Sequence, residues 1–337
     1  FAQSKLAMAS PVVLRQLGLG SLRRIYKLDP TELCSTLTDA AKRRVNDKQV
    51  WDALLYRAAL LRGELRPLQL AQVVDTLGRV RRHDDAFLDY MLHEVRVKSK
   101  SFNVRDTALL MNGFAKLAVR DELLTSSLLP SLLRRISGKT RYDDLALLAL
   151  SLTRIGDPSR ETIFDRIVAS ITPRIDAVND GHTLSLLTCA FARPPLAGQS
   201  GDVAPLFALD DGEGQRPPVG MDASEEEVDD GQNRIPHLGF VEALLLQCER
   251  HMWTFRAGDV LHLCLALSVL VRNGHEDLLP SRLLKRLERR MESLHFEFLP
   301  AQFVRLLEVL ASLPDLERRC ASKLLDEVAY RMRDVTP

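Results

Sequence analysis

Two stretches decide the fold: DTALLMNGFAKL at Asp106–Leu117 and DLALLALSLTRI at Asp144–Ile155. Each begins with an acidic residue and then places apolar side chains three and four positions apart, which is the spacing of one face of an α-helix. A small residue, Ala115 or Thr153, follows the apolar stripe and leaves room for a neighbouring helix. The two stretches therefore predict two helices of one design.

The same pattern recurs along the chain. Its copies begin at Glu32, Gln69, Asp106, Asp144, His182, Asp259 and Gln302. Successive starts differ by 37, 37, 38, 38, 77 and 43 in residue number, and the step of 77 indicates one repeat that carries a long insertion. A regular period of this length, 37 to 38, is typical of helical-repeat arrays, because a single helical pair cannot bury its apolar face alone.

Each repeat also contains a second expected helix, in which apolar residues fall at every fourth position. Leu283, Leu287 and Met291 show the spacing, which keeps side chains on one helical face. Stacked neighbours would bury both stripes. We therefore expect an all-α protein, an α-solenoid of about six antiparallel helical pairs, with an unrelated all-α bundle as the alternative.

The sequence divides into four expected segments. Residues 1–28 form a basic N-terminal arm, and residues 29–193 hold the repeats up to the first helix of the fifth. Residues 194–235 form an acidic insertion, expected to be disordered, with ten acids and two bases between Pro194 and Arg234. Residues 236–337 continue from the second helix of the fifth repeat into the seventh. The insertion could shield a basic surface, bind a basic partner, or be a tolerated loop.

Composition and charge narrow the class of protein. The 337 residues are 46% hydrophobic and 6% aromatic, with a net charge of +1, which suits a large helical core. Without the acidic segment the remainder has 44 basic and 35 acidic residues, a net charge of +9. The longest nearly uncharged run, Val260–Val271, is too short to span a bilayer, so no membrane contact is expected.

The start of the chain is basic. Phe1–Leu28 contains five bases, including Arg15, Arg23 and Arg24, and no acid. Such a segment resembles an organellar transit region or its remnant, and an ordinary basic arm is an equal alternative. An arm of this kind, without a core of its own, also suits phosphate backbones.

No motif indicates catalysis, a cofactor or a metal. The five cysteines form no Cys-x-x-Cys pair, which favours buried thiols in a reducing compartment. The adjacent acids Asp84–Asp85 and Asp143–Asp144 stand where helices are expected to begin, so capping of free N–H groups explains them better than acid–base chemistry. We expect a protein that is not an enzyme, with no cofactor and no small-molecule substrate.

The period and the pattern D-x-A-x-L-x-x-G/A-x-x-x-L/I resemble the heptatricopeptide and octotricopeptide repeat arrays of organellar RNA-binding proteins, including the RAP-domain and FAST-kinase-like group. The resemblance covers roughly residues 29–337. It implies RNA binding in an organelle, either in mRNA or rRNA maturation or at the ribosome. No RAP-like domain appears before Pro337, so a nuclease-like or processing role is not carried over.

Basic residues recur at two places in each repeat, late in the first helix and near the end of the second. Stacking would align them into stripes that follow an RNA backbone, although helix C-termini favour cations in any case. The candidate RNA-binding residues are Arg15, Arg23, Arg24, Arg81, Arg82, Lys116, Arg120, Arg134, Arg135, Lys139, Arg174, Lys285, Arg286, Arg289 and Arg290.

Few aromatic residues interleave with these bases. Phe102, Phe255 and Phe298 share one position before first helices, which indicates core packing and not a stacking platform. Contacts with phosphate and RNA shape are therefore expected over reading of bases. We expect a mitochondrial matrix protein, or alternatively a plastid one, that is a ribosome component or binds rRNA and neighbouring organellar proteins. The alternative is a scaffold that grips proteins only.

Overall fold

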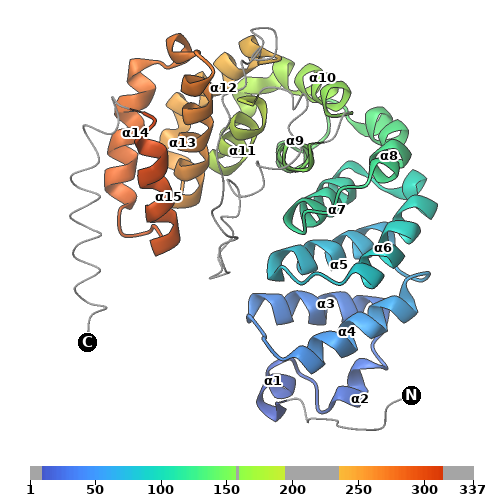
Figure 1. Ribbon diagram of the computed structural model, residues 1–337. Helices are drawn as coiled ribbons and strands as arrows, with labels where there is room; N and C mark the ends of the chain where they lie inside the picture. Colours follow the sequence, from blue (N-terminus) through green and yellow to red (C-terminus); the bar gives the residue numbers. More distant parts are fainter. Residues whose placement is uncertain (1–9, 157–158, 194–234, 314–337) are drawn as a thin grey trace, which may run out of the picture. The chain divides into compact units, whose positions relative to one another are not determined.

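The computed structural model describes residues 10–156, 159–193 and 235–313 (Figure 1). Every regular element in these residues is helical and none is a strand, which confirms the expected all-α class. The chain divides into two compact units, an N-terminal unit of residues 1–137 and a C-terminal unit of residues 138–337. The acidic segment 194–234 and the expected last helix lie outside the described residues.

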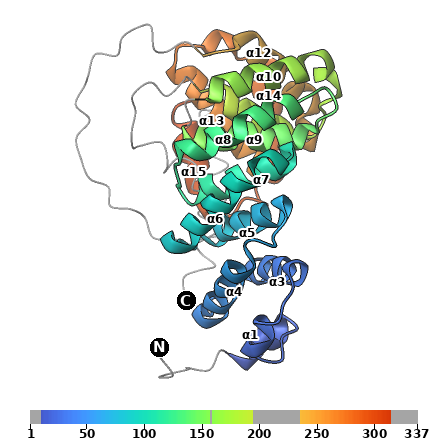
Figure 2. The ribbon, with the colours of Figure 1, turned by 90° about the vertical axis from the view of Figure 1, so that its right-hand side faces the viewer.

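The N-terminal unit holds two short helices followed by three helical pairs. Its elements are α1 (Pro11–Gln16), α2 (Leu22–Ile25), α3 (Pro30–Lys42), α4 (Lys48–Leu61), α5 (Pro67–Val80), α6 (Asp85–Val97), the 3-10 turn η1 (Ser99–Ser101), α7 (Val104–Lys116) and α8 (Glu122–Arg135). The first helices α3, α5 and α7 pack side by side, and the second helices α4, α6 and α8 form a row beside them (Figure 1). Figure 2 shows α3 beside α4 and α5 beside α6.

The C-terminal unit continues the alternation. Its elements are α9 (Tyr142–Ile155), α10 (Arg160–Ile171), η2 (Thr172–Ala177), α11 (Gly181–Phe191), α12 (Leu238–His251), η4 (Met252–Thr254), α13 (Ala257–Arg272), η5 (Glu276–Leu278), α14 (Ser281–Leu294) and α15 (Pro300–Leu310). The first helices α9, α11, α13 and α15 pack in sequence, and α12 packs against α14. Helices α11 and α12 pack together across segment 194–234, which accounts for the long interval between the repeat starts at His182 and Asp259.

The apolar residues that recur at equivalent positions of the repeats form the core as expected. We call each such set of equivalent positions an apolar column. The first-helix column is fully or nearly buried; its members are Val73, Leu77, Leu110, Phe114, Leu148, Leu152, Leu186, Ala190, Leu263, Leu267, Leu306 and Leu310. The second-helix column is buried at Leu128, Leu132, Ile136, Ile167, Ile171, Leu244, Cys248, Met252, Leu283, Leu287 and Met291. Ile175 is the exception, because the chain there leaves α10 and enters η2, where it is only half-buried.

The polar residue that opens each repeat has a local purpose. In five first helices its side chain accepts a hydrogen bond from the backbone N–H three residues earlier, which the helix itself cannot satisfy. The acceptors are Glu32, Gln69, Asp106, Asp259 and Gln302, with N–O distances of 3.2, 2.9, 3.4, 3.0 and 3.0 Å. The repeat therefore begins with a side chain that caps its own helix, and this explains why Glu, Gln and Asp can replace one another there. The cap is reciprocal at Asp29 and Asn103, whose side chains accept in turn from Glu32 N and Asp106 N.

Helices α5 and α7 approach to backbone contact. A Cβ on Gly113 would lie 2.6 Å from the carbonyl oxygen of Val74, and one on Gly78 would lie 2.8 Å from that of Gly113. The buried carboxylate of Asp75 between them accepts bonds from Asn112 Nδ2 at 2.7 Å and Arg79 Nε at 2.9 Å. The small residues therefore let two helices meet closely around a satisfied polar pair.

The links between first and second helices repeat one backbone turn. The residue that ends the turn has a positive φ, and it is Arg44, Arg81, Ala118, Gly156 or Gly274. The first four recur at the same intervals as the helix starts of their repeats. Backbone bonds such as Val45 N to Ala40 O at 3.0 Å close the turn, which is the usual way to end a helix. The period of the sequence is thus also a period of the backbone.

The expectation that residues 1–28 have no core of their own is wrong for the described part. Leu14, Leu19, Ile25 and Leu28 are buried, and α2 packs against α4. The apolar residues of this basic segment cover the open side of the first pair, because α3 and α4 would otherwise expose their stripe there. Arginines between them stay on the surface.

Two further expectations concern cysteines and membranes. Cys34, Cys189, Cys248 and Cys264 are buried free thiols, as the sequence predicted, and Cys320 lies outside the described residues. Burial raises the pKa of Cys34 to about 11, so this thiol stays protonated. Among the described helices, none has the length and apolar character needed to cross a membrane.

Candidate nucleic-acid interface

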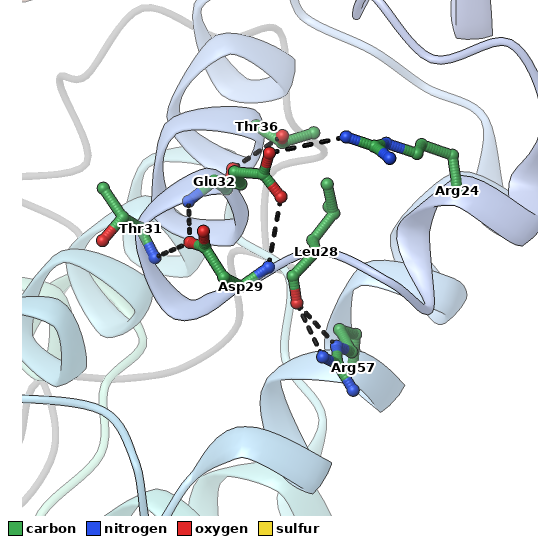
Figure 3. A network of polar contacts seen from close by, with 7 residues as sticks. All are labelled: Arg24, Leu28, Asp29, Thr31, Glu32, Thr36 and Arg57. Carbon is green, nitrogen blue, oxygen red and sulfur yellow. Dashed lines mark hydrogen bonds and ion pairs between the residues drawn. The ribbon is translucent and has the colours of Figure 1, made fainter.

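Basic residues at the ends of second helices tie each repeat together. In the first repeat, Arg57 of α4 donates from Nε and Nη2 to the carbonyl oxygen of Leu28, at 2.9 and 2.7 Å (Figure 3). Leu28 directly precedes Asp29, the residue that caps α3 by accepting from Thr31 N and Glu32 N (Figure 3). The guanidinium therefore links the end of one helix to the entry of its partner.

The same link recurs in four further repeats, each time to the carbonyl just before a first helix. The donors are Lys98 to Leu65 O at 2.8 Å, Arg135 to Phe102 O at 2.8 Å, Arg174 to Thr140 O at 2.7 Å and Arg290 to Phe255 O at 2.6 Å. We call these five contacts the base–carbonyl ties. A charged donor to a backbone carbonyl stabilises by roughly 1.5–3 kcal/mol.

The base–carbonyl ties change the interpretation of the second-helix column. Arg135, Arg174 and Arg290, predicted as RNA ligands, each have a structural task, and Arg174 also lies 4.4 Å from the centre of the Tyr142 ring. Sequence reasoning missed Arg57. In the second repeat it placed an acid, Glu94, in the column, and an acid cannot donate to the carbonyl. Lys98, one helical turn after Glu94, supplies the charge instead.

The predicted residues of the N-terminal segment are exposed. Arg15 lies in α1, and Arg23 and Arg24 lie in α2. Arg24 pairs with Glu32 at 3.5 Å across the start of α3 (Figure 3). This pair is solvent-exposed and therefore weak. What these three arginines have in common is the segment that holds them, residues 10–28, which covers the open side of the first helical pair.

Four predicted residues belong to the links of the N-terminal unit. Arg81 ends α5 with a positive φ and is exposed, while Arg82 is tied to Asp52 of α4 at 2.5 Å. Lys116 is half-buried in the last turn of α7, and Arg120 is exposed just before α8. Acidic caps of the second helices lie in the same links, so the positive charge there is largely balanced.

Two predicted residues flank the boundary between the units. Arg134 is exposed, and its Nε donates to the carbonyl of Pro130 in its own helix at 3.0 Å. Lys139 is exposed ahead of α9. Neither residue contributes to a charged row within its own unit.

In the C-terminal unit, two arginines near helix ends are buried, whereas Arg272 at the end of α13 is exposed. Arg193 is only 9% exposed, and Arg160 at the start of α10 is 3% exposed. Burial, together with the charges of Arg154 and Arg160, lowers the pKa of Arg193 to about 10. Arg160 pairs with Glu161 at 2.8 Å and lies 5.3 Å from the centre of the Phe164 ring. These guanidiniums are part of the packed interior and not of a surface that RNA could reach.

The remaining predicted residues share one face of α14. This helix buries Leu283, Leu287, Met291 and Leu294 on one side. Its opposite side exposes four bases at helical spacing, namely Arg282, Lys285, Arg286 and Arg289. We call these four the α14 basic face. The acids of the helix, Glu288 and Glu292, are half-buried beside it.

The helix dipole does not account for the α14 basic face. Cations stabilise the last turn of a helix, which in α14 holds no base, and destabilise the first turn. Arg282 is the second residue of α14 and Lys285 the fifth. Like charges three and four residues apart also repel one another. Favourable placement at a helix end therefore does not explain why these bases share one exposed stripe.

The capping prediction is confirmed at Asp84, which accepts from Phe87 N at 3.0 Å as the cap of α6. Asp143 and Asp144 lie in the first turn of α9, but Asp143 accepts from the side chains of Arg141 and Thr183 and α9 has no side-chain cap bond. At the start of α11, His182 Nδ1 lies 2.8 Å from Asp259 Oδ1 of α13. The hydrogen bond to Asp259 raises the pKa of His182 although burial opposes it; burial raises the pKa of Asp259, but its hydrogen bonds lower it overall.

A metal site was also sought in residues 10–156, 159–193 and 235–313. No group of three or more His, Cys, Asp or Glu residues is arranged there to hold a metal ion. Comparison with known proteins adds no candidate: no protein-family model matches the chain, and no curated protein is significantly similar to it. The α14 basic face is thus the feature that sequence and structure single out together.

Proposed function

We propose that this protein is an organellar RNA-binding helical-repeat protein, a mitochondrial ribosome component or rRNA-associated factor that contacts the RNA backbone. The observation that carries the proposal is the α14 basic face. Its four exposed bases form one stripe on one helix and begin where the helix dipole disfavours them; of the four, Arg286 also donates to the carbonyl of Glu249. The bases of such a stripe would replace several of the cations that are bound to the RNA phosphates.

The proposal includes an α-solenoid of about six antiparallel pairs as the frame. Support comes from the rows of first and second helices within each unit and from positive-φ links that recur with the period of the sequence. Repeated pairs of this kind present extended surfaces, which suit a long ligand such as rRNA better than a small molecule. No enzymatic step, cofactor or metal forms part of the proposal.

The proposed location is the mitochondrial matrix, with the plastid as the alternative. It is supported by the basic, acid-free segment at residues 1–28 and by the resemblance of the repeat period to organellar repeat arrays. Ribosomal and other organellar proteins are the expected neighbours of such a factor.

The test is the salt dependence of RNA binding by the full chain. Affinity for an rRNA fragment should fall by more than about tenfold between roughly 50 and 200 mM salt, because phosphate contacts release counterions. Fluorescence anisotropy of a labelled fragment measures it. Binding that is absent at low salt, or that does not change with salt, would contradict the proposal.

A protein scaffold is the second candidate, and one surface favours it. The second helices of the N-terminal unit expose Tyr56, Leu60 and Tyr90, and the rings of Tyr26 and Tyr56 meet edge to face at 5.9 Å. Exposed tyrosines are common at protein interfaces. A scaffold would keep its partners after ribonuclease digestion and lose them in a Tyr56→Asp/Tyr90→Asp variant, whereas an RNA-dependent association would disappear with the nuclease alone.

A further inference from the structure

Trp253 is the most exposed large apolar side chain in the described part of the chain. It lies in η4, directly after α12, and 72% of it is accessible to solvent. The other tryptophan, Trp51, is 2% exposed and donates from Nε1 to the carbonyl of Val45 at 2.7 Å. A tryptophan that leaves its ring in water loses the energy that burial would supply, so its position requires a reason.

Arginines of α14 attach to the backbone on both sides of Trp253. Arg286 donates from Nη1 to the carbonyl of Glu249 at 2.5 Å, four residues before the tryptophan. Arg290 donates to the carbonyl of Phe255 at 2.6 Å, two residues after it. The turn η4 also packs against α14. The backbone on both sides of Trp253 is therefore tied to α14, the helix that carries the α14 basic face.

The next repeat places a second aromatic ring at the equivalent position. Phe296 precedes the repeat start at Gln302 by the same interval as Trp253 precedes the start at Asp259, and it is 63% exposed. The neighbouring pair Phe255 and Phe298 has the same spacing and is buried. In both repeats one aromatic ring enters the core and the ring two residues earlier points to solvent. Core packing explains the inner rings and leaves the outer rings unexplained.

We propose that Trp253 stacks on an unpaired base of a single-stranded RNA segment whose phosphates lie along the α14 basic face. This inference rests on the proposed function and deepens it, because it names the form of RNA. Aromatic side chains next to a basic groove are the common means of binding single strands, since every base offers a π-face. The sequence analysis found few aromatic residues among the bases, and under this proposal Trp253 is one of those few.

Charge decides between RNA and a protein partner for Trp253. Exposed bases lie close to Trp253 in the sequence, namely Arg250 at the end of α12 and Arg256 just before α13, and Arg289 is exposed on α14, against which η4 packs. Arg250 is paired with Asp176 at 3.0 Å. Such a surface fits a polyanion with flat rings, which describes single-stranded RNA. An acidic peptide is the competing ligand and becomes an outcome of the test.

The two tryptophans make the experiment direct. In a Trp51→Phe variant, Trp253 is the only source of tryptophan fluorescence. A single-stranded oligouridylate of about twelve nucleotides should quench this emission, and an RNA duplex of equal length should bind with little quenching. In the otherwise native chain, Trp253→Ala should weaken oligouridylate binding roughly tenfold and leave duplex binding unchanged. Trp253→Phe should retain most of the affinity.

The outcomes separate this inference from the proposed function. If oligouridylate binds in a salt-dependent manner but Trp253→Ala has no effect, the stacking proposal fails and the RNA-binding proposal stands. If neither RNA binds at low salt, both proposals fail. Quenching by poly-glutamate and not by oligouridylate would assign the surface to an acidic protein instead. Because Trp253 is exposed, unchanged thermal unfolding of the alanine variant should show that its fold is intact.

Discussion

Helices α8 and α14 hold equivalent places as the second helices of the third and sixth repeats, yet they use their bases differently. Each has an arginine near its C-terminal end that ties the helix to the carbonyl before its partner, Arg135 in one and Arg290 in the other. Beyond that tie, α8 exposes Leu123, Ser126, Pro130 and one further base, Arg134, at the position of Arg289, whereas α14 exposes all four bases of the α14 basic face. The shared base belongs to the fold, and the additional bases distinguish α14.

The difference shows how to interpret charge in a repeat protein. A base that recurs in every repeat has a cause that every repeat shares, and here the cause is a carbonyl next to a helix start. A base that occurs in one repeat only, against the helix dipole, needs a cause specific to that repeat. Recurrence along the chain is therefore evidence for architecture, and departure from it is evidence for a ligand.

The largest expected effect comes from removing bases of the α14 basic face, of which α8 has only one equivalent, Arg134. Arg282→Gln/Lys285→Gln/Arg289→Gln should weaken binding of single-stranded RNA by more than about tenfold at low salt. It should also reduce the slope of log affinity against log salt by about 2, because three phosphate contacts are lost. Anisotropy titrations over a range of salt measure both quantities.

A matched variant controls for net charge. Arg43→Gln/Lys100→Gln/Arg105→Gln removes three exposed bases from the N-terminal unit. It should change the affinity much less, since these bases share no helical stripe. Equal losses in the two variants would mean that total charge, and not the α14 basic face, controls binding.

The second expected effect tests what α8 and α14 share. Arg135→Ala and Arg290→Ala should each lower the free energy of unfolding of their unit by about 1.5–3 kcal/mol, because a carbonyl loses a charged donor. Urea denaturation measures this. Replacement by Met keeps much of the packing of the aliphatic stem, so a Met variant as unstable as the Ala variant would assign the loss to the hydrogen bond.

A third effect compares the links of the two units. Ala118 has a φ of +55° in the N-terminal unit, and Gly274 has a φ of +77° in the C-terminal unit with open space around it. Ala118→Gly should raise stability by about 0.5–1 kcal/mol, and Gly274→Ala should lower it by a similar amount. Thermal unfolding measures both. The same sign of change in the two variants would contradict the argument from backbone strain.

The smallest effect concerns pH and the C-terminal unit alone. The hydrogen bond to Asp259 raises the pKa of His182, and Asp143 and Asp180 act in the same direction. The charged pair therefore stabilises fully below the unfolded pKa of about 6.5, and the contribution is lost as pH rises through the raised folded pKa. The loss should stay below about 1 kcal/mol because the imidazole is more than half exposed.

The His182→Gln variant is the control for this pH dependence. Its stability should change less than that of the native chain between about pH 6 and pH 8. A native chain that becomes more stable over this interval would reverse the expected sign. At lower pH the pair weakens again, because the lowered pKa of Asp259 makes its carboxylate stabilising only while ionised.

The repeat and its core could be predicted from sequence because apolar spacing is a local property. Leu110 and Leu267 are buried because each belongs to a stripe of apolar side chains, three and four residues apart, on one face of its helix. The tasks of the bases could not be predicted, since Arg135 and Arg289 look alike in sequence. Only the positions of distant carbonyls separate them, and those depend on how helices pack.

Which aromatic residues are exposed could not be predicted from the sequence either. Trp253 and Phe255 stand two positions apart, and a 3-10 turn directs one outward and the other inward. A sequence signal did exist: Trp253 and Phe296 have the same spacing as Phe255 and Phe298. One buried aromatic position in each repeat explains Phe255 and Phe298, but it does not explain the second position, at Trp253 and Phe296.

The fifth repeat departs from its neighbours in how it is closed. His251 stands where the third, fourth and sixth repeats have an arginine, and among the described residues the carbonyl of Asn179 accepts from the hydroxyl of Thr254, at 3.4 Å, in place of a base. Gln247 and Arg250 bind the exposed Asp176 side chain instead. This is also the repeat whose two helices are separated by residues 194–234. Amide protons at the start of α11 should therefore exchange with solvent sooner than those at the starts of α7 or α13. A protease should also cleave the start of α11 before it cleaves the starts of those two helices.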